Sequence, residues 1–99
     1  MNNQLSAQTF KTGSLVKVYM QSIPENAFRY GVTVMLQQEF LIIFKNGSII
    51  KRLDPYYLFI EYICATYLIE EEFKSIEDLL LQFNLGLFQD IFKNIHEHI

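Results

Sequence analysis

The chain has 99 residues, of which 51% are hydrophobic and 19% are charged, and its net charge at neutral pH is -3. This composition excludes intrinsic disorder, and the length leads us to expect that residues 1–99 fold as a single domain. The start of the chain lacks the basic and apolar regions of a signal peptide, and its most apolar segment, 56–69, is shorter than the roughly 20 residues that span a bilayer. We therefore expect a soluble protein with no membrane partner.

The first part of the chain, residues 13–54, has the pattern of β-strands. Branched and aromatic residues are concentrated in runs that polar, turn-forming residues separate. The first three predicted strands cover residues 15–21, 29–36 and 39–45. The third contains five consecutive apolar residues, which predicts a strand covered on both faces. Turns are expected at 22–26 and at Gln37 and Gln38.

Asn46 and Gly47 predict a two-residue type I′ hairpin turn, because both residues tolerate the positive φ angles that this turn requires. Such a turn fixes the register of the two strands that it joins. The expected pairs are Phe44 with Ile49, Ile43 with Ile50 and Ile42 with Lys51. A fourth strand is therefore predicted over residues 48–53.

The second part, residues 55–99, has the pattern of helices. Asp54 followed by Pro55 is typical of a helix start, and the run over 56–72 has no polar face, which predicts a helix buried on nearly all sides. Cys64 lies inside this run, so we expect it to be a small buried residue.

Two shorter helices are predicted after it. Ser75 has the position of an N-cap, with Glu77 and Asp78 in the first turn of a helix over 76–83. Residues 84–86 include a glycine that can end this helix, and apolar residues recur at helical spacing over 87–98.

Together these elements predict an α+β fold, in which a four-stranded antiparallel meander is followed by two or three C-terminal helices. A small SH3-like barrel is the close variant of the predicted sheet. Residues 1–54 carry six basic and three acidic side chains, and residues 55–99 carry two basic and eight acidic ones. The sheet is thus expected to be basic, with a net charge of +3, and the helices acidic, with a net charge of -6.

No motif in the sequence indicates catalysis or a cofactor. The glycines are scattered singly, which does not form a phosphate-binding loop, and the two histidines, His96 and His98, are two residues apart near the end of the chain. Cys64 has no neighbour in the sequence that would stabilise a thiolate. We therefore expect a protein that is not an enzyme and binds no cofactor or metal, in a reducing, cytoplasmic setting.

An interaction with another protein, or self-association, is the function that the composition favours. The chain has nine Phe and six Tyr residues, more bulky apolar side chains than one small core hides. The expected contributors to an exposed interface are Tyr56, Tyr57, Tyr62, Tyr67, Phe88 and Phe92. Filling the space between sheet and helices is the alternative role of these side chains.

A nucleic-acid-binding β-barrel is the alternative function. Its contacts with phosphates would come from the basic residues of the predicted sheet, which are Lys17, Arg29, Lys45, Lys51 and Arg52. The acidic isoelectric point, about 5.2, weakens the long-range attraction on which such binding depends.

Overall fold

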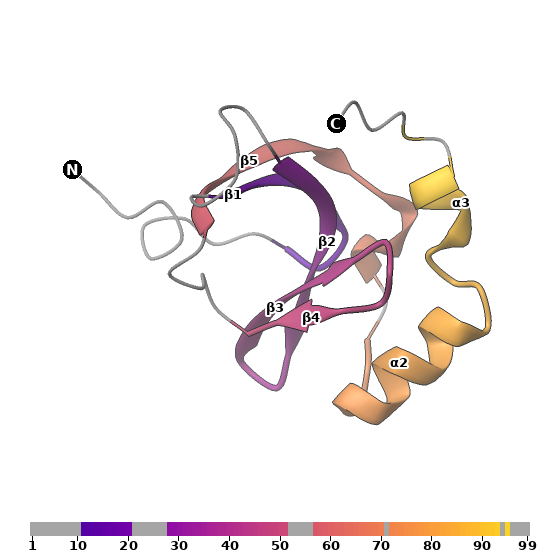
Figure 1. The fold of residues 1–99 in the computed structure, drawn as a ribbon. Coiled ribbons are helices and arrows are strands. Elements are labelled where there is room, and N and C mark those ends of the chain that lie inside the picture. Colours follow the sequence, from indigo (N-terminus) through magenta and orange to yellow (C-terminus); the bar gives the residue numbers. More distant parts are fainter. Residues whose placement is uncertain (1–10, 21–27, 52–56, 71, 94, 96–99) are drawn as a thin grey trace.

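The computed structural model describes residues 11–20, 28–51, 57–70, 72–93 and 95, and combines one antiparallel sheet with short helices near the C-terminus (Figure 1). The strands are β1 (Ser14–Met20), β2 (Phe28–Leu36), β3 (Glu39–Phe44), β4 (Ile49–Ile50) and β5 (Tyr57–Ala65). The helical elements are the 3-10 helix η1 (Tyr67–Glu70) and the α-helices α2 (Ile76–Asn84) and α3 (Gln89–Lys93). The predicted α+β class is confirmed, with five strands in place of four.

The first three strands form where the sequence predicts them. β1 pairs with β2, and β2 pairs with β3, in antiparallel registers that place Val32 opposite Leu15 on one side and opposite Ile43 on the other. Gln37 and Gln38 close the β2–β3 hairpin with φ angles of 52° and 70°, which confirms the tight turn expected there. β3 is buried on both faces from Leu41 to Phe44, also as predicted.

The β3–β4 hairpin has a different turn from the predicted one. The Phe44 amide donates a 2.9 Å hydrogen bond to the Ser48 carbonyl, and Gly47, with φ 90°, donates to the Phe44 carbonyl at 2.8 Å. The loop therefore has three residues, of which Gly47 alone takes a positive φ, and Asn46 accepts hydrogen bonds from Ser48 with its side chain instead. The predicted register was wrong by one residue: Ile42 pairs with Ile50, and Ile43 with Ile49.

The predicted helix over 56–72 was also wrong. Tyr57–Ala65 forms the strand β5, which pairs with β1 along its length, and only Tyr67–Glu70 is helical, as a 3-10 turn. A run of aromatic and branched residues without a polar face suits a strand at least as well as a helix, and here it pairs with the otherwise free edge of β1. The sheet thus continues beyond residue 54, and Cys64 is exposed in β5 instead of buried in a helix.

The strand order is β4-β3-β2-β1-β5, so that β4 and β5 are the two edges of an open sheet in the part of the chain that the structure describes. The SH3-like barrel is therefore not confirmed. Each face of the sheet has its own group of buried side chains. One group lies under the helices and joins Leu15, Val32, Val34, Leu36, Leu41 and Ile43 to Leu68, Phe73, Leu79, Phe88 and Phe92. The other consists of strand residues: Val16, Val18, Ile42, Phe44 and Ile60.

The boundaries of the two C-terminal helices agree with the predicted ones only in part. The Ser75 hydroxyl accepts a hydrogen bond from the Asp78 amide at 3.0 Å, which confirms the predicted N-cap of α2. Gly86, with φ 98°, follows the end of α2. α3 is described at Gln89–Lys93, a shorter span than the predicted 87–98. Figure 1 shows α2 and α3 together on one side of the sheet, beside the β3–β4 turn.

Several predictions fall on residues outside the described part of the chain. They are the turn over 22–26, the helix start at Asp54 and Pro55, and the placement of His96 and His98. Among the described residues, no helix has the length and hydropathy needed to span a membrane.

Candidate functional site

Of the six aromatic residues predicted to form an interface, the four whose side chains the structure describes lie in two different environments. Tyr62 and Tyr67 are exposed, with 52% and 58% of their surface accessible. Phe88 and Phe92 lie in the core under the helices and fill the space between helices and sheet, so they do not contribute to an exposed interface in this structure. Tyr56 lies outside the described residues, as does the side chain of Tyr57.

One of the two exposed tyrosines, Tyr62, lies on the edge strand β5 of the sheet. Five consecutive residues of β5, from Glu61 to Ala65, are exposed, although strands normally bury the side chains of at least one face. Ile63 has no partner residue in β1, because the register shifts there and leaves it as a bulge. This segment, 61–65, is called the β5 edge below.

The one charged residue of the β5 edge is held by the neighbouring strand. The Tyr19 hydroxyl donates a 2.7 Å hydrogen bond to the Glu61 carboxylate. This hydrogen bond, together with desolvation and the nearby negative charge, raises the pKa of the Tyr19 phenol above its ordinary value. Because the Glu61 carboxylate is engaged with β1, it leaves the β5 edge largely apolar.

The basic residues that were predicted to contact nucleic-acid phosphates do not lie together on one surface, as far as the structure describes them. Nζ of Lys17 lies 4.5 Å from the centroid of the Phe28 ring and 5.9 Å from that of the Tyr30 ring. Cζ of Arg29 lies 4.1 Å from the centroid of the Phe44 ring. Since Lys17 pairs with Tyr30, and Arg29 with Val18, the two cations emerge from opposite faces of the sheet.

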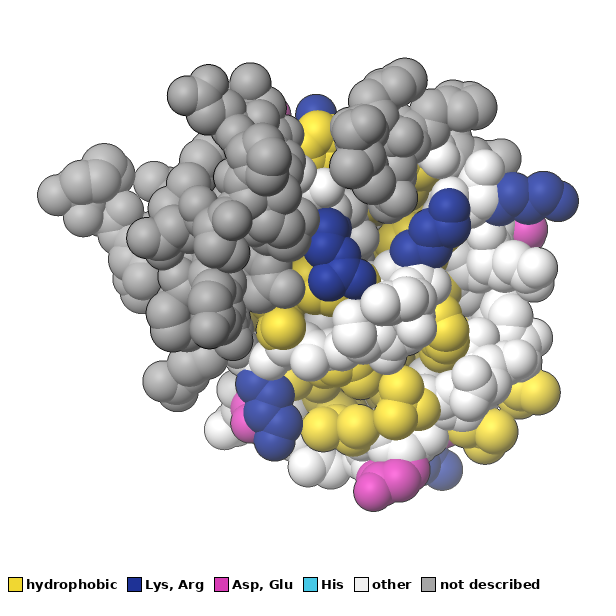
Figure 2. All heavy atoms as spheres, in the orientation of Figure 1, with side chains coloured by type: hydrophobic (Ala, Val, Ile, Leu, Met, Phe, Trp, Pro, Cys, Tyr) yellow, Lys and Arg dark blue, Asp and Glu magenta, His cyan; other side chains and the backbone are white. Residues whose placement is uncertain are grey.

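The remaining basic residues are also dispersed. Lys45 is exposed in the β3–β4 turn, Lys51 is exposed after β4, and Arg52 lies outside the described residues. Figure 2 shows the Lys and Arg side chains of that view separated from one another by hydrophobic and uncharged surface, some of them beside acidic side chains. Short-range stacking on aromatic rings is therefore the role that the structure gives to Lys17 and Arg29.

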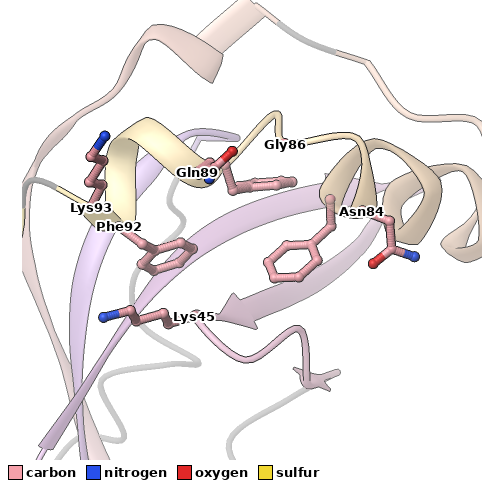
Figure 3. A pocket seen from close by; sticks show the side chains of 8 residues that line it. Lys45, Asn84, Gly86, Gln89, Phe92 and Lys93 are labelled. Carbon is pink, nitrogen blue, oxygen red and sulfur yellow. The ribbon is translucent and has the colours of Figure 1, made fainter.

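A cavity that the sequence did not predict lies between the β3–β4 turn and the two C-terminal helices. Its volume is about 580 Å³, and three phenylalanine side chains line it, two of which, Phe88 and Phe92, belong to the buried core. Its exposed lining includes two lysines, Lys45 and Lys93. Figure 3 shows both lysines at one end of the cavity, with the Phe92 ring between them.

The turn of the β3–β4 hairpin and α2 are packed together at the wall of this cavity. A Cβ atom on Gly47 would lie 3.0 Å from Cε2 of Phe83, so the backbone of the turn touches the Phe83 ring. The rings of Phe83 and Phe88 lie 5.9 Å apart, and those of Phe88 and Phe73 lie 6.2 Å apart. The cavity is thus built on a continuous row of aromatic side chains, which fixes its shape.

Sequence reasoning missed this cavity because its lining comes from the hairpin turn and from both helices. The tyrosine of η1 helps to position the segment before α3, since the Tyr67 hydroxyl donates a 2.6 Å hydrogen bond to the Leu87 carbonyl. The two lysines are 48 positions apart in the sequence, and no local pattern links them.

Among the described residues, no group of three or more His, Cys, Asp or Glu side chains is placed to hold a metal ion. Comparison with known proteins gives no match: no family model, no curated protein and no solved structure is significantly similar to this chain.

Proposed function

We propose that this chain is a small non-enzymatic interaction protein that associates through the β5 edge, and that its partner there is a second copy of the same chain. The observation that supports this is the five-residue exposed segment from Glu61 to Ala65 on an edge strand of the sheet. An edge strand offers backbone N–H and C=O groups to a further strand, and such strand addition is a common mode of protein association.

The sequence of the edge is compatible with pairing to itself. If two β5 strands pair antiparallel about Ile63, the Glu61 of each copy lies opposite Ala65 of the other, and Tyr62 lies opposite Cys64. No like charges then meet across the interface, which removes the repulsion that would oppose such pairing. The two Ile63 side chains meet on the twofold axis.

The exposed thiol of Cys64 is consistent with the same proposal. A free, exposed cysteine suits a reducing compartment, so the proposal places the protein in the cytoplasm. Because Cys64 lies within the segment that would pair, it also provides a chemical probe of that segment.

Light scattering coupled to size-exclusion chromatography at micromolar concentration tests the proposal. We expect a dimer for the natural chain and a monomer for Ile63→Lys, because two lysines would then face each other on the axis. Leu85→Lys is the matched control: Leu85 is 71% exposed beside the end of α2, so this variant removes apolar surface away from β5 and should remain a dimer. Circular dichroism of both variants establishes that they are folded.

Labelling of Cys64 gives an independent readout. A bulky maleimide should react more slowly as the protein concentration rises, and the labelled protein should be monomeric. A natural chain that is monomeric throughout the micromolar range would refute the proposal, and so would equal dissociation by Ile63→Lys and Leu85→Lys.

A further inference from the structure

We infer that the cavity between the β3–β4 turn and the C-terminal helices is a binding site for a small aromatic carboxylate. This inference is independent of the β5 edge, because the cavity lies under α2 and α3 and shares no residue with that edge.

The size of the cavity is that of a ligand site. Its volume of about 580 Å³ is many times the roughly 30 Å³ that one water molecule occupies in the liquid. Ligand-binding pockets for small organic molecules lie between about 300 and 1,000 Å³. The cavity is thus too large to be a packing defect filled by a single water molecule.

The buried part of the lining is apolar and aromatic. Phe88 and Phe92 are 0% and 4% exposed, and Phe83 is half-buried beside them. An aromatic body placed against the accessible face of the Phe83 ring would gain offset or edge-to-face contacts and would release water from that apolar surface. An inorganic anion would leave the Phe83 ring facing water, so the chemistry favours an organic ligand.

The exposed part of the lining is cationic, in a chain whose net charge is -3. Lys45 and Lys93 contribute two ammonium groups, and the described lining contains no Asp or Glu. Within the described part of the chain, neither lysine is paired with a carboxylate. Since Figure 3 places both lysines on the side of the cavity away from Asn84, that side has the more positive potential and favours a negative charge.

The opposite end of the cavity is polar and uncharged. Figure 3 shows the Asn84 side chain at the end away from the lysines, with Gln89 between. Amide groups donate and accept hydrogen bonds, but they attract neither sign of charge strongly. The cavity therefore has a direction: the carboxylate is expected on the side of Lys45 and Lys93, and the aromatic body over the Phe83 ring.

Binding of naphthaleneacetate, compared with its neutral amide, tests this inference in the natural chain. Titration calorimetry should show about tenfold tighter binding of the carboxylate than of the amide, since each of the two exposed charge pairs adds a modest electrostatic contribution. In a two-dimensional NMR spectrum of the amides, the Gly86 signal should shift, because Gly86 lines the cavity.

Three lysine variants separate a specific site from general attraction. Lys45→Gln and Lys93→Gln should each weaken carboxylate binding about threefold, and together they should abolish the preference over the amide. Lys51→Gln is the matched control, because Lys51 is exposed after β4 but does not line the cavity. All three side chains are exposed, so these variants are expected to fold.

Three results would overturn the inference. They are equal affinity for carboxylate and amide, equal weakening by Lys51→Gln and Lys45→Gln, and absence of binding at millimolar concentration with an unchanged Gly86 signal.

Discussion

Replacing Gly47 by alanine tests how the hairpin turn and the helices are joined at the cavity. Gly47 has a φ of 90°, and holding an L-residue in the left-handed region costs roughly 1–2 kcal/mol. Alanine also restricts the unfolded chain, which offsets about 0.4–1 kcal/mol of that cost. The backbone effect alone should therefore destabilise the protein by about 1 kcal/mol.

Contact with Phe83 adds a second contribution at this position. The new Cβ atom would lie 3.0 Å from Cε2 of Phe83, closer than van der Waals contact, and the Phe83 ring is packed against Phe88. Overpacking of this kind costs about 1–3 kcal/mol. The total loss for Gly47→Ala is then expected to be about 2–4 kcal/mol, a large part of the stability of a small domain.

Gly86→Ala is the matched control for this experiment. Gly86 has a similar φ of 98°, but a Cβ there would meet only Oε1 of Gln89, at 3.1 Å, and Gln89 is an exposed side chain that can move. This variant should lose only the backbone contribution, about 1 kcal/mol.

Urea unfolding, followed by circular dichroism, measures both free energies. With a slope of roughly 1–3 kcal/mol per molar urea, the two midpoints should differ by about 0.3 M or more. Equal losses for the two variants would show that the β3–β4 turn does not pack against Phe83, and would refute the geometry of the cavity wall.

Two further predictions concern the β2–β3 turn and the Tyr19–Glu61 hydrogen bond. Gln38→Gly should stabilise the protein by about 0.5–1 kcal/mol, because Gln38 has a φ of 70°, whereas Gln82→Gly, in the interior of α2, should destabilise it by about 1 kcal/mol. Urea midpoints below that of the natural chain in both variants would contradict the observed turn. The raised pKa of Tyr19 means that its contribution to stability is complete below about pH 10, the unfolded value, and is lost as the pH rises through the folded pKa. Phenolate absorbance should show one tyrosine titrating late in the natural chain, and this late step should be absent from Tyr19→Phe and should move to lower pH in Glu61→Gln. A late step that persists in Tyr19→Phe, or that is unchanged in Glu61→Gln, would exclude the hydrogen bond.

The elements that the sequence predicts well are those with local causes. The alternating residues of β1, the apolar run of β3 and the Ser75 cap each depend on neighbours within a few positions, and all three lie where the sequence predicts them. The hairpin after β3 was only half predictable, because Gly47 marks the turn but a loop of two or three residues can be built around it.

The candidate sites were less predictable than the fold. Of the described side chains in the predicted interface, Tyr62 and Tyr67 are exposed, but Phe88 and Phe92 are buried, and burial depends on what the helices cover. The cavity could not be foreseen, since Lys45 and Lys93 meet only after α3 has packed beside the hairpin.

The segment Tyr57–Ala65 shows which structural features the local sequence determines and which depend on tertiary contacts. Its residues specify by themselves an apolar segment without a polar face, and both a buried helix and a strand satisfy that description. Pairing with β1 favours the strand, because the otherwise free edge of β1 gains a ladder of backbone hydrogen bonds when β5 pairs with it. The same pairing places the β5 edge and Cys64 at the end of the sheet, because β5 pairs with β1 on one side and no further described strand pairs with it on the other.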